Sequence, residues 1–532
     1  MSLAFTPQTH SRPTVLPVAM RPVCCMALAL FYLAAPLVIA AELLKPVLSI
    51  TLLVFFFVWL REFSGFAFGA PLAGRGFRAK IRIALPRREA VGPAIAIFVL
   101  AAAWIYFSGI GSFTYCRYDY IKHNLVFTSL LSGHLPISAG PGGDIVHYYF
   151  AYYIIPVRLF QMLQPVFGVL RLEHVTYALY CLALLGSLHL LASSLRVPAM
   201  GLLLVMVFTG GLDLVGRFLL GAGLQEWGRA GGIPYFFDLD WWGVPYAPQS
   251  LTLNLFWAPQ HFFGAVIGTA LICAIFALPR PRRTQLLHAA CVVVASALWS
   301  PYVAIGLAIA VLGIVSKVLF RDTFAGALPD SAPPRLQAGF IGSVGFLILL
   351  SAFVLVFFAA AHPASAPSVI FVQAAFGAWL LSFVLRLAPA IVAAAVLWFR
   401  RRRQRDNAGE AGDLGRSLVF LLAVEAGLLC FTHGAYNDWA MRTTLPVSIL
   451  VAAGLCRFLL AGVGDAARIV VGGLLILSSA SSVNEFAQSA FLPHQCAAYG
   501  SYAWSDLGQF VDQYRGNGNS VLYRWLVRNP GP

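Results

Sequence analysis

Long uninterrupted apolar stretches recur along most of the chain and limit its fold more than any other feature. The first two cover residues 23–41 and 47–60, and only the short polar turn at 42–45 separates them. A helix needs about 20 apolar residues to cross the hydrocarbon core of a bilayer. Only helices and closed barrels satisfy their backbone hydrogen bonds there, and a barrel would show short alternating segments. The pattern therefore predicts an all-α polytopic membrane protein.

The composition excludes several other classes of protein. Of the 532 residues, 60% are hydrophobic and only 11% are charged, and the mean hydropathy is +0.80. A soluble chain carries about 25% charged residues, so a large soluble enzyme and a disordered chain are excluded. The net charge of +15 does not indicate binding to nucleic acid, because the basic residues gather in a few loops, as a topology signal would.

These basic loops orient the predicted spans. Residues 61–89 form the most basic loop, and further clusters lie at 280–283 and 400–416. The positive-inside rule places all three in the cytoplasm, together with the N-terminus. A third span over 91–110 then leads to a first outer loop that begins at Gly111. A cleaved signal peptide is not expected, because a second span directly follows the first.

Four apolar stretches lie between this outer loop and the cytoplasmic cluster at 280–283, whereas an odd number of spans must connect the two sides. We interpret residues 145–168 as the stretch that does not cross, because its dense tyrosines are typical of an interfacial helix. About thirteen spans result, with the N-terminus inside and the C-terminus outside. The remaining predicted spans cover residues 174–195, 199–219, 251–278, 285–299, 302–320, 336–360, 369–398, 417–432, 444–460 and 468–486.

The topology divides the chain into three regions. Residues 1–90 comprise an N-terminal cytoplasmic segment, the two-helix hairpin and the basic cytoplasmic loop. Residues 91–486 form the main transmembrane domain, with outer loops at 111–173 and 220–250. Residues 487–532 form a short extracytoplasmic tail, which is too small for us to expect an independent domain. Most cysteines lie inside apolar runs, but Cys116 and Cys496 fall in outer segments and could pair.

The first outer loop carries the first candidate site. It reads Tyr115-Cys-Arg-Tyr-Asp-Tyr-Ile-Lys-His-Asn124. If this stretch is helical, Asp119, Lys122 and His123 lie within one turn of each other. A carboxylate placed there could act as a base towards a hydroxyl group of an acceptor. The alternative is a loop with ordinary surface charges.

The second outer loop contains a polar and aromatic patch. Asp238, Asp240, Trp241 and Trp242 lie within five residues, and Gln260 and His261 follow near the next span. Aromatic faces beside carboxylates suit sugar rings, which stack through their CH surfaces and offer hydroxyl groups. The alternative is an interfacial tryptophan belt. Two aspartates could help to hold a divalent cation, but they make an incomplete site, and no metal ligand set is assigned.

A third cluster lies just before the span at 444–460. His433, Asn437, Asp438 and Arg442 fall within ten residues, and Arg442 could hold a phosphate group at the membrane surface. The alternative is an Asp438–Arg442 pair that caps the next helix.

Four further charges lie deeper in the predicted spans. Asp213 and Arg217 are four residues apart and are expected to pair. Glu425 and Arg386 fall within two different spans. Charges inside spans are functional candidates by default, but we expect a structural pair between Glu425 and Arg386.

Taken with these clusters, the chain resembles the GT-C class of integral-membrane glycosyltransferases over roughly residues 90–486. The acidic residue in the first large outer loop, the flat helix after it, about thirteen spans and an outer C-terminus carry the resemblance. The segments YDYIKHN, FTGGLD, NLFWAPQH and YNDWAMRTTLP also look like those of bacterial membrane proteins of GT-C type. In typical members the acidic loop follows the first span, whereas here it follows the third.

The resemblance implies a reaction and roles for residues. GT-C enzymes move a sugar from a polyprenyl-phosphate carrier on the non-cytoplasmic face, here of the inner (plasma) membrane. Asp119 matches the proposed catalytic base. Arg442 is expected to hold the phosphate, with Lys122 or Arg158. The expected partners are the polyprenyl-phosphate-linked sugar and membrane lipids, without nucleic acid.

Three other functions remain open. A transporter or lipid-linked-sugar flippase would need charges along a path through the midplane, which Glu425 and Arg386 could supply, and usually internal repeats, which the sequence lacks. A polysaccharide polymerase or ligase usually has a large late outer loop, whereas the loop at 433–443 is short. A non-enzymatic scaffold would not explain why the polar clusters share one side.

Overall fold

The structure is a computed structural model that describes most residues of the chain. These are residues 21–68, 88–117, 119–133, 135–137, 144–219, 227–230, 233–236, 239, 250–324, 338–359, 370–371, 376–403, 410–432, 438–461, 463–492 and 515–517. The predicted site residues Asp238, Asp240, Trp241, Trp242, His433 and Asn437 lie outside them.

Helices make up almost all of the described chain. In order they are α1 (Arg21–Leu43), α2 (Pro46–Phe68), α3 (Arg88–Phe107), α4 (Tyr120–Ser132), α5 (Ala151–Phe167), α6 (Leu172–Leu195), α7 (Ala199–Phe208), α8 (Asp213–Leu219), α9 (Leu251–Trp257), α10 (Pro259–Ala277), α11 (Arg282–Ser296), α12 (Pro301–Val315), α13 (Arg321–Phe324), α14 (Ala338–Ala359), α15 (Phe376–Arg386), α16 (Ala388–Arg403), α17 (Glu410–Leu428), α18 (Asp438–Thr443), α19 (Leu445–Leu460), α20 (Asp465–Ser478) and α21 (Ala480–Phe491).

Three short antiparallel strand pairs accompany the helices. They are β1 (Asp144–Val146) with β6 (Arg515–Asn517), β2 (Trp227–Ala230) with β3 (Ile233–Phe236), and β4 (Ile370–Phe371) with β5 (Phe431–Thr432). In the first pair Ile145 lies opposite Gly516. Part of the predicted C-terminal tail is therefore hydrogen-bonded to the first predicted outer loop.

Within the described residues, seven helical segments are long and apolar enough to cross a membrane. They are Arg21–Leu43, Pro46–Phe68, Leu172–Leu195, Ala199–Leu219, Pro259–Ala277, Gly339–Ala359 and Asp465–Phe491. A bent pair, Trp379–Arg386 with Ala388–Arg402, would make an eighth. The chain is thus an all-α polytopic membrane protein, as the sequence predicted.

The count of thirteen spans and the orientation stay predictions. Three further apolar helices, Val91–Phe107, Pro301–Val315 and Leu445–Leu460, are shorter than a full span. Helices α11 and α17 were each predicted to cross, but neither is among the candidate spans or among these shorter apolar helices. Nor is α5 (Ala151–Phe167), which was predicted not to cross.

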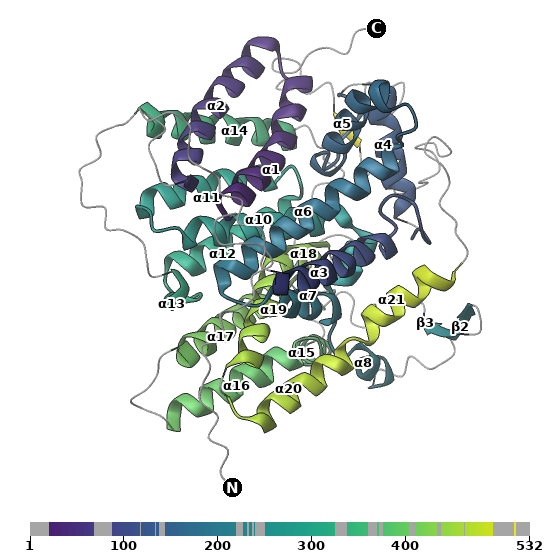
Figure 1. Ribbon diagram of the computed structural model, residues 1–532, viewed down its shortest axis with the longest axis vertical. Helices are drawn as coiled ribbons and strands as arrows, with labels where there is room; N and C mark the ends of the chain where they lie inside the picture. Colours follow the sequence, from purple (N-terminus) through teal and green to yellow (C-terminus); the bar gives the residue numbers. More distant parts are fainter. Residues whose placement is uncertain are drawn as a thin grey trace.

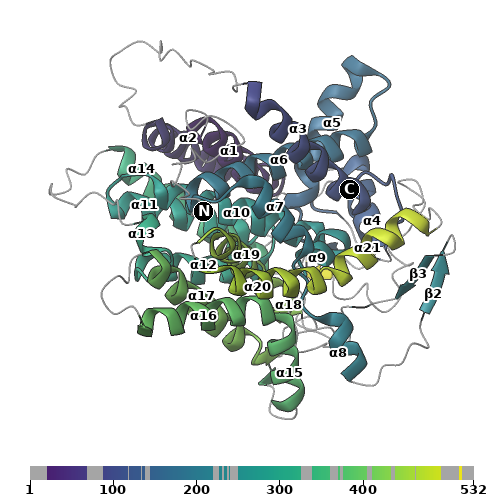
Figure 2. The same ribbon diagram turned by 60° about the horizontal axis from the view of Figure 1, so that its bottom comes forward.

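Helix α10 forms the centre of the bundle. Every residue from Pro259 to Phe276 is buried, and α6, α11, α12 and α19 pack around this helix (Figure 1, Figure 2). Its start is set locally, because Pro259 occupies the first helical turn, where a missing backbone N–H costs nothing. The preceding helix α9 has Ser250 as its N-cap, with the hydroxyl accepting from the Leu253 N–H.

The N-terminal hairpin packs onto this bundle. Pro46 begins α2 directly after the turn, and the Ser49 hydroxyl donates to the Ala40 carbonyl at 3.2 Å, which closes the turn. Helix α1 contacts α5, α6, α10 and α11, and α2 lies beside α14 in both views (Figure 1, Figure 2). The hairpin is therefore part of the same hydrophobic core as the main domain.

One deep ion pair differs from the sequence prediction. Arg386 pairs with Asp213 at 2.7 Å, both fully buried, and the second carboxylate oxygen of Asp213 accepts from the Ser481 hydroxyl. The expected pair between Arg386 and Glu425 is wrong, because Glu425 instead accepts from the Ser448 hydroxyl at 2.9 Å. Arg386 does interrupt the predicted span at 369–398, since α15 and α16 meet there at 74°.

Candidate functional site

Asp119 stands directly before α4, where its carboxylate is held by a lysine one turn later. The Lys122 ammonium donates to Asp119 at 2.9 Å, and the Asp119 side chain is 30% exposed. Burial would raise the pKa of this carboxyl, but the nearby positive charge and hydrogen bond, chiefly those of Lys122, outweigh it and hold the pKa below its ordinary value of 3.8. Asp119 is therefore ionised at neutral pH and can accept a hydrogen bond from a hydroxyl group.

His123 lies beneath this pair and has partners at both ring nitrogens. Nε2 donates to the Trp257 carbonyl at 3.1 Å, so Nδ1 accepts from the Tyr153 hydroxyl at 2.5 Å. The side chain is buried, and burial lowers its pKa to about 3, which keeps the imidazole neutral. His123 thus joins α4 to α5 and α9, and its predicted contact with substrate would require one of these bonds to break.

Arg442 reaches the same neighbourhood from α18. It is buried and donates through Nη1 to the Asn254 side-chain carbonyl, while its Nε lies 3.6 Å from Asp438. The structure thus contains the Asp438–Arg442 pair that the spacing allowed. The Asn254 amide in turn donates to the Ser250 carbonyl at 3.1 Å, which fixes its orientation. Sequence reasoning missed Asn254, although an asparagine within the apolar run 251–257 is a usable signal.

The first turn of α10 contributes two buried polar side chains. Gln260 donates to the Tyr148 hydroxyl at 3.0 Å, and the His261 ring lies 5.4 Å from that of Tyr149 and 6.4 Å from that of Tyr302. Among the described residues, the side-chain oxygen Oε1 of Gln260 and the ring nitrogen Nδ1 of His261 have no hydrogen-bond partner. Buried polar atoms of this kind usually meet water or a ligand.

These groups form one electrostatic neighbourhood. Asp119 interacts with Lys122 and Arg442, and His261 interacts with the same two cations. Tyr148 interacts with Asp119, Lys122 and Asp438. The structure therefore brings together predicted site residues from three segments that are distant in sequence.

Arg158 belongs to a different place. Its guanidinium binds Glu42 through Nε at 2.6 Å and through Nη2 at 2.8 Å. The remaining N–H groups donate to the carbonyls of Leu130 and Gly133 and to the Gln161 side chain. All five donors of the guanidinium thus have acceptors. Arg158 ties α5 to the N-terminal hairpin and has no donor left for a phosphate.

The predicted outer loop is also anchored to α21. Arg117 is buried and donates to the Glu485 carboxylate at 2.7 Å and to the Ser489 hydroxyl at 2.6 Å. Its guanidinium lies 4.8 Å from the centre of the Phe256 ring. The preceding residue, Cys116, is in a disulfide bond. Cys496, which could be its partner, lies outside the described residues, and the other seven cysteines are free.

The tyrosines that suggested an interfacial helix point inward. Tyr148, Tyr152 and Tyr153 are buried, and each hydroxyl or ring has a partner in the protein. The apolar side chains that remain exposed on α5 lie at its other end, at Met162, Val166 and Phe167.

No metal centre is indicated among the described residues, since no three His, Cys, Asp or Glu side chains lie close enough together to hold an ion. No family model, curated protein or solved structure matches the chain.

Proposed function

We propose that this chain is a glycosyltransferase that moves a sugar from a polyprenyl-phosphate carrier to a lipid, glycan or protein acceptor. The reaction would take place on the extracytoplasmic face of the inner (plasma) membrane, in a GT-C-like bundle of about thirteen spans. The observation that carries the proposal is an ionised, part-exposed carboxylate, Asp119, that is bound by Lys122 and lies within electrostatic range of the buried Arg442.

This arrangement suits an inverting transfer. Asp119 accepts the proton of the acceptor hydroxyl while the oxygen of that hydroxyl forms a bond to the anomeric carbon of the sugar. The bond from that carbon to the phosphate oxygen breaks, and its electron pair stays on the phosphate. Lys122 and Arg442 stabilise the negative charge that develops there. Arg158 is given a structural role instead, because all its donors are used.

The disulfide at Cys116 supports the outward placement of this loop. Disulfides form and persist in oxidising compartments and are rare in the cytosol. Cys116 lies three residues before Asp119, so both would face the extracytoplasmic side.

The test is transfer of a labelled sugar in membranes that contain the chain and a panel of polyprenyl-phosphate sugars. Asp119→Asn should lower the transfer rate by at least about 100-fold, the usual contribution of a positioned base. Asp465→Asn is the control, because the Asp465 side chain is 90% exposed at the start of α20. Full activity in Asp119→Asn would show that Asp119 is not the base. A wild type that transfers none of the sugars would contradict the proposed function.

A transporter or lipid-linked-sugar flippase is the second candidate. It is favoured by Glu425, which is buried without an ion-pair partner among the described residues. Solute uptake that depends on Glu425 but not on Asp119 would support this alternative.

A further inference from the structure

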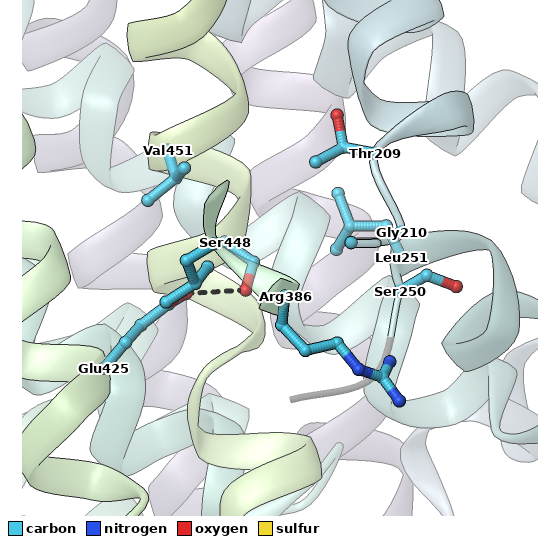
Figure 3. Close-up of a pocket in the computed structure, with 10 residues that line it drawn as sticks. Thr209, Gly210, Ser250, Leu251, Arg386, Glu425, Ser448 and Val451 are labelled. Atoms are coloured by element: carbon cyan, nitrogen blue, oxygen red, sulfur yellow. Dashed lines mark hydrogen bonds between the residues drawn. The ribbon is translucent and has the colours of Figure 1, made fainter. Parts of the chain in front are cut away.

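A small cavity lies between α7, α9, α15, α17 and α19, and Ser250, which supports Asn254, is on its border. It has a volume of about 40 Å³, which is enough for one ion or one to two water molecules. Glu425 and Ser448 lie on one side of it, and Thr209 and Gly210 lie on the other (Figure 3). Its lining residues are Thr209, Gly210, Gly211, Ser250, Leu251, Arg386, Leu387, Glu425, Ser448 and Val451.

Two interrupted helices meet at this cavity. The candidate span Ala199–Leu219 is broken at 209–212, and the bent pair is broken at Leu387. The Leu212 N–H donates to the Leu385 carbonyl at 2.9 Å, so the two breaks are hydrogen-bonded to each other. Gly211 has φ +86°, and a Cβ there would lie 2.7 Å from the Arg386 Cα. Interrupted helices inside a membrane expose backbone carbonyls that commonly coordinate small cations.

Glu425 is the charged group that faces this space. It is fully buried; its Oε1 accepts from Ser448, and its Oε2 has no hydrogen-bond partner among the described residues. The nearest cation of the lining, Arg386, is taken by Asp213, and its guanidinium points away from Glu425 (Figure 3). A buried carboxylate without a counter-charge is costly.

We propose that this cavity binds one monovalent cation of the size of Na⁺, with Glu425 as its charged ligand. The Ser448 hydroxyl oxygen and backbone carbonyls of 209–211 would supply neutral oxygen ligands. A single carboxylate balances one positive charge, whereas a divalent ion would keep an excess charge in the interior. A protonated Glu425 would leave the unfolding temperature independent of Na⁺, so the test below distinguishes a bound ion from a bound proton.

The inference is independent of the glycosyltransferase proposal, because its test measures binding and stability. The purified full chain is heated in detergent at increasing NaCl, with choline chloride keeping the ionic strength constant. The wild type should show an unfolding temperature that rises with Na⁺ and then saturates, since a ligand stabilises the folded state that binds it. A flat response would overturn the proposal, and so would an equal response to choline alone.

Two variants locate the ion. Glu425→Gln keeps the shape of the side chain and should abolish the dependence on Na⁺, whereas Ser448→Ala should require about tenfold more Na⁺ for the same shift. Asp413→Asn is the matched control, because Asp413 is a buried acid on the same helix α17 that does not line the cavity. It should keep the full Na⁺ response. A full response in Glu425→Gln would contradict the site.

Direct binding keeps the proposal testable if Glu425→Gln does not fold. Wild-type chain equilibrated with radioactive Na⁺ should retain one ion per chain, and unlabelled NaCl should displace it. No retained ion in this assay would refute the proposal.

Discussion

The Arg158 guanidinium binds both carboxylate oxygens of Glu42, with Nε 2.6 Å from Oε1 and Nη2 2.8 Å from Oε2. The two residues are 116 positions apart, and each side chain is less than one-fifth exposed. The Glu42 carboxylate also accepts from the Leu135 N–H at 3.1 Å. One carboxylate thus connects the N-terminal hairpin to α5 and to the segment after α4.

Removing either partner should destabilise the chain. Arg158→Lys cannot reproduce the two parallel bonds, and we expect the free energy of unfolding to fall by about 2 kcal/mol. Asp465→Asn serves as the control, since the Asp465 side chain is 90% exposed and its pair with Arg468 should be worth less than about 0.5 kcal/mol. Denaturant titration in detergent measures both. Equal effects in the two variants would show that the Glu42 contact is not structural.

The corrected pairing of Arg386 also makes a prediction. Asp213→Asn removes the carboxylate that pairs with the buried Arg386 charge, which should cost about 3–5 kcal/mol. The double variant Asp213→Leu with Arg386→Met removes both charges and should recover much of this loss. Unfolding midpoints of the double variant and of the single variants Asp213→Leu and Arg386→Met measure the coupling. A double variant that is as unstable as the sum of the two single changes would mean that the residues do not interact.

The pH dependence of transfer should reflect the low pKa of Asp119. A base is active when it is deprotonated, so activity should persist as the pH falls and should be lost, on account of this group, only below the ordinary aspartate pKa of 3.8. Lys122→Met removes a charge that lowers the Asp119 pKa, so the acidic limb should move to higher pH. A rate profile from pH 3 to pH 8 on both proteins measures the shift. If the acidic limb does not move, the Lys122 charge does not lower the pKa of the catalytic base.

The disulfide at Cys116 should stabilise the predicted outer loop. Cys116→Ser is expected to lower the free energy of unfolding by about 2–4 kcal/mol. A reductant should have the same effect on the wild type and no further effect on the variant. Cys430→Ser is the control, because Cys430 is free. The reductant should still lower the free energy of unfolding of this variant. If reductant leaves the wild type unchanged, the bond does not contribute.

The sequence predicted features that depend on neighbouring residues. The apolar run 23–41 became α1 (Arg21–Leu43), and the spacing of Asp438 and Arg442 became a contact at 3.6 Å. It could not predict pairs between distant segments. Arg117 and Glu485 are 368 residues apart, and Arg386 met Asp213 instead of Glu425, because bundle packing decides which helix faces which.

The same limit affected the tyrosines and the candidate site. Composition alone made residues 145–168 typical of a membrane interface, but Tyr153 is buried because its hydroxyl finds His123 as a partner. Asn254 went unnoticed because its importance comes from Arg442, which lies 188 residues later. Hydrogen-bond partners of this kind follow from the three-dimensional arrangement and leave no local pattern.

Helix α9 supports two regions at once. Its N-cap Ser250 and first residue Leu251 border the Glu425 cavity, its middle residue Asn254 holds Arg442, and the carbonyl of its last residue Trp257 holds His123. A helix of seven residues is about 10 Å long, so the cavity and the supports of Arg442 and His123 lie along one short helix. Displacement of α9 as a unit at the cavity would carry both supports with it, so α9 is a mechanical link between the two regions.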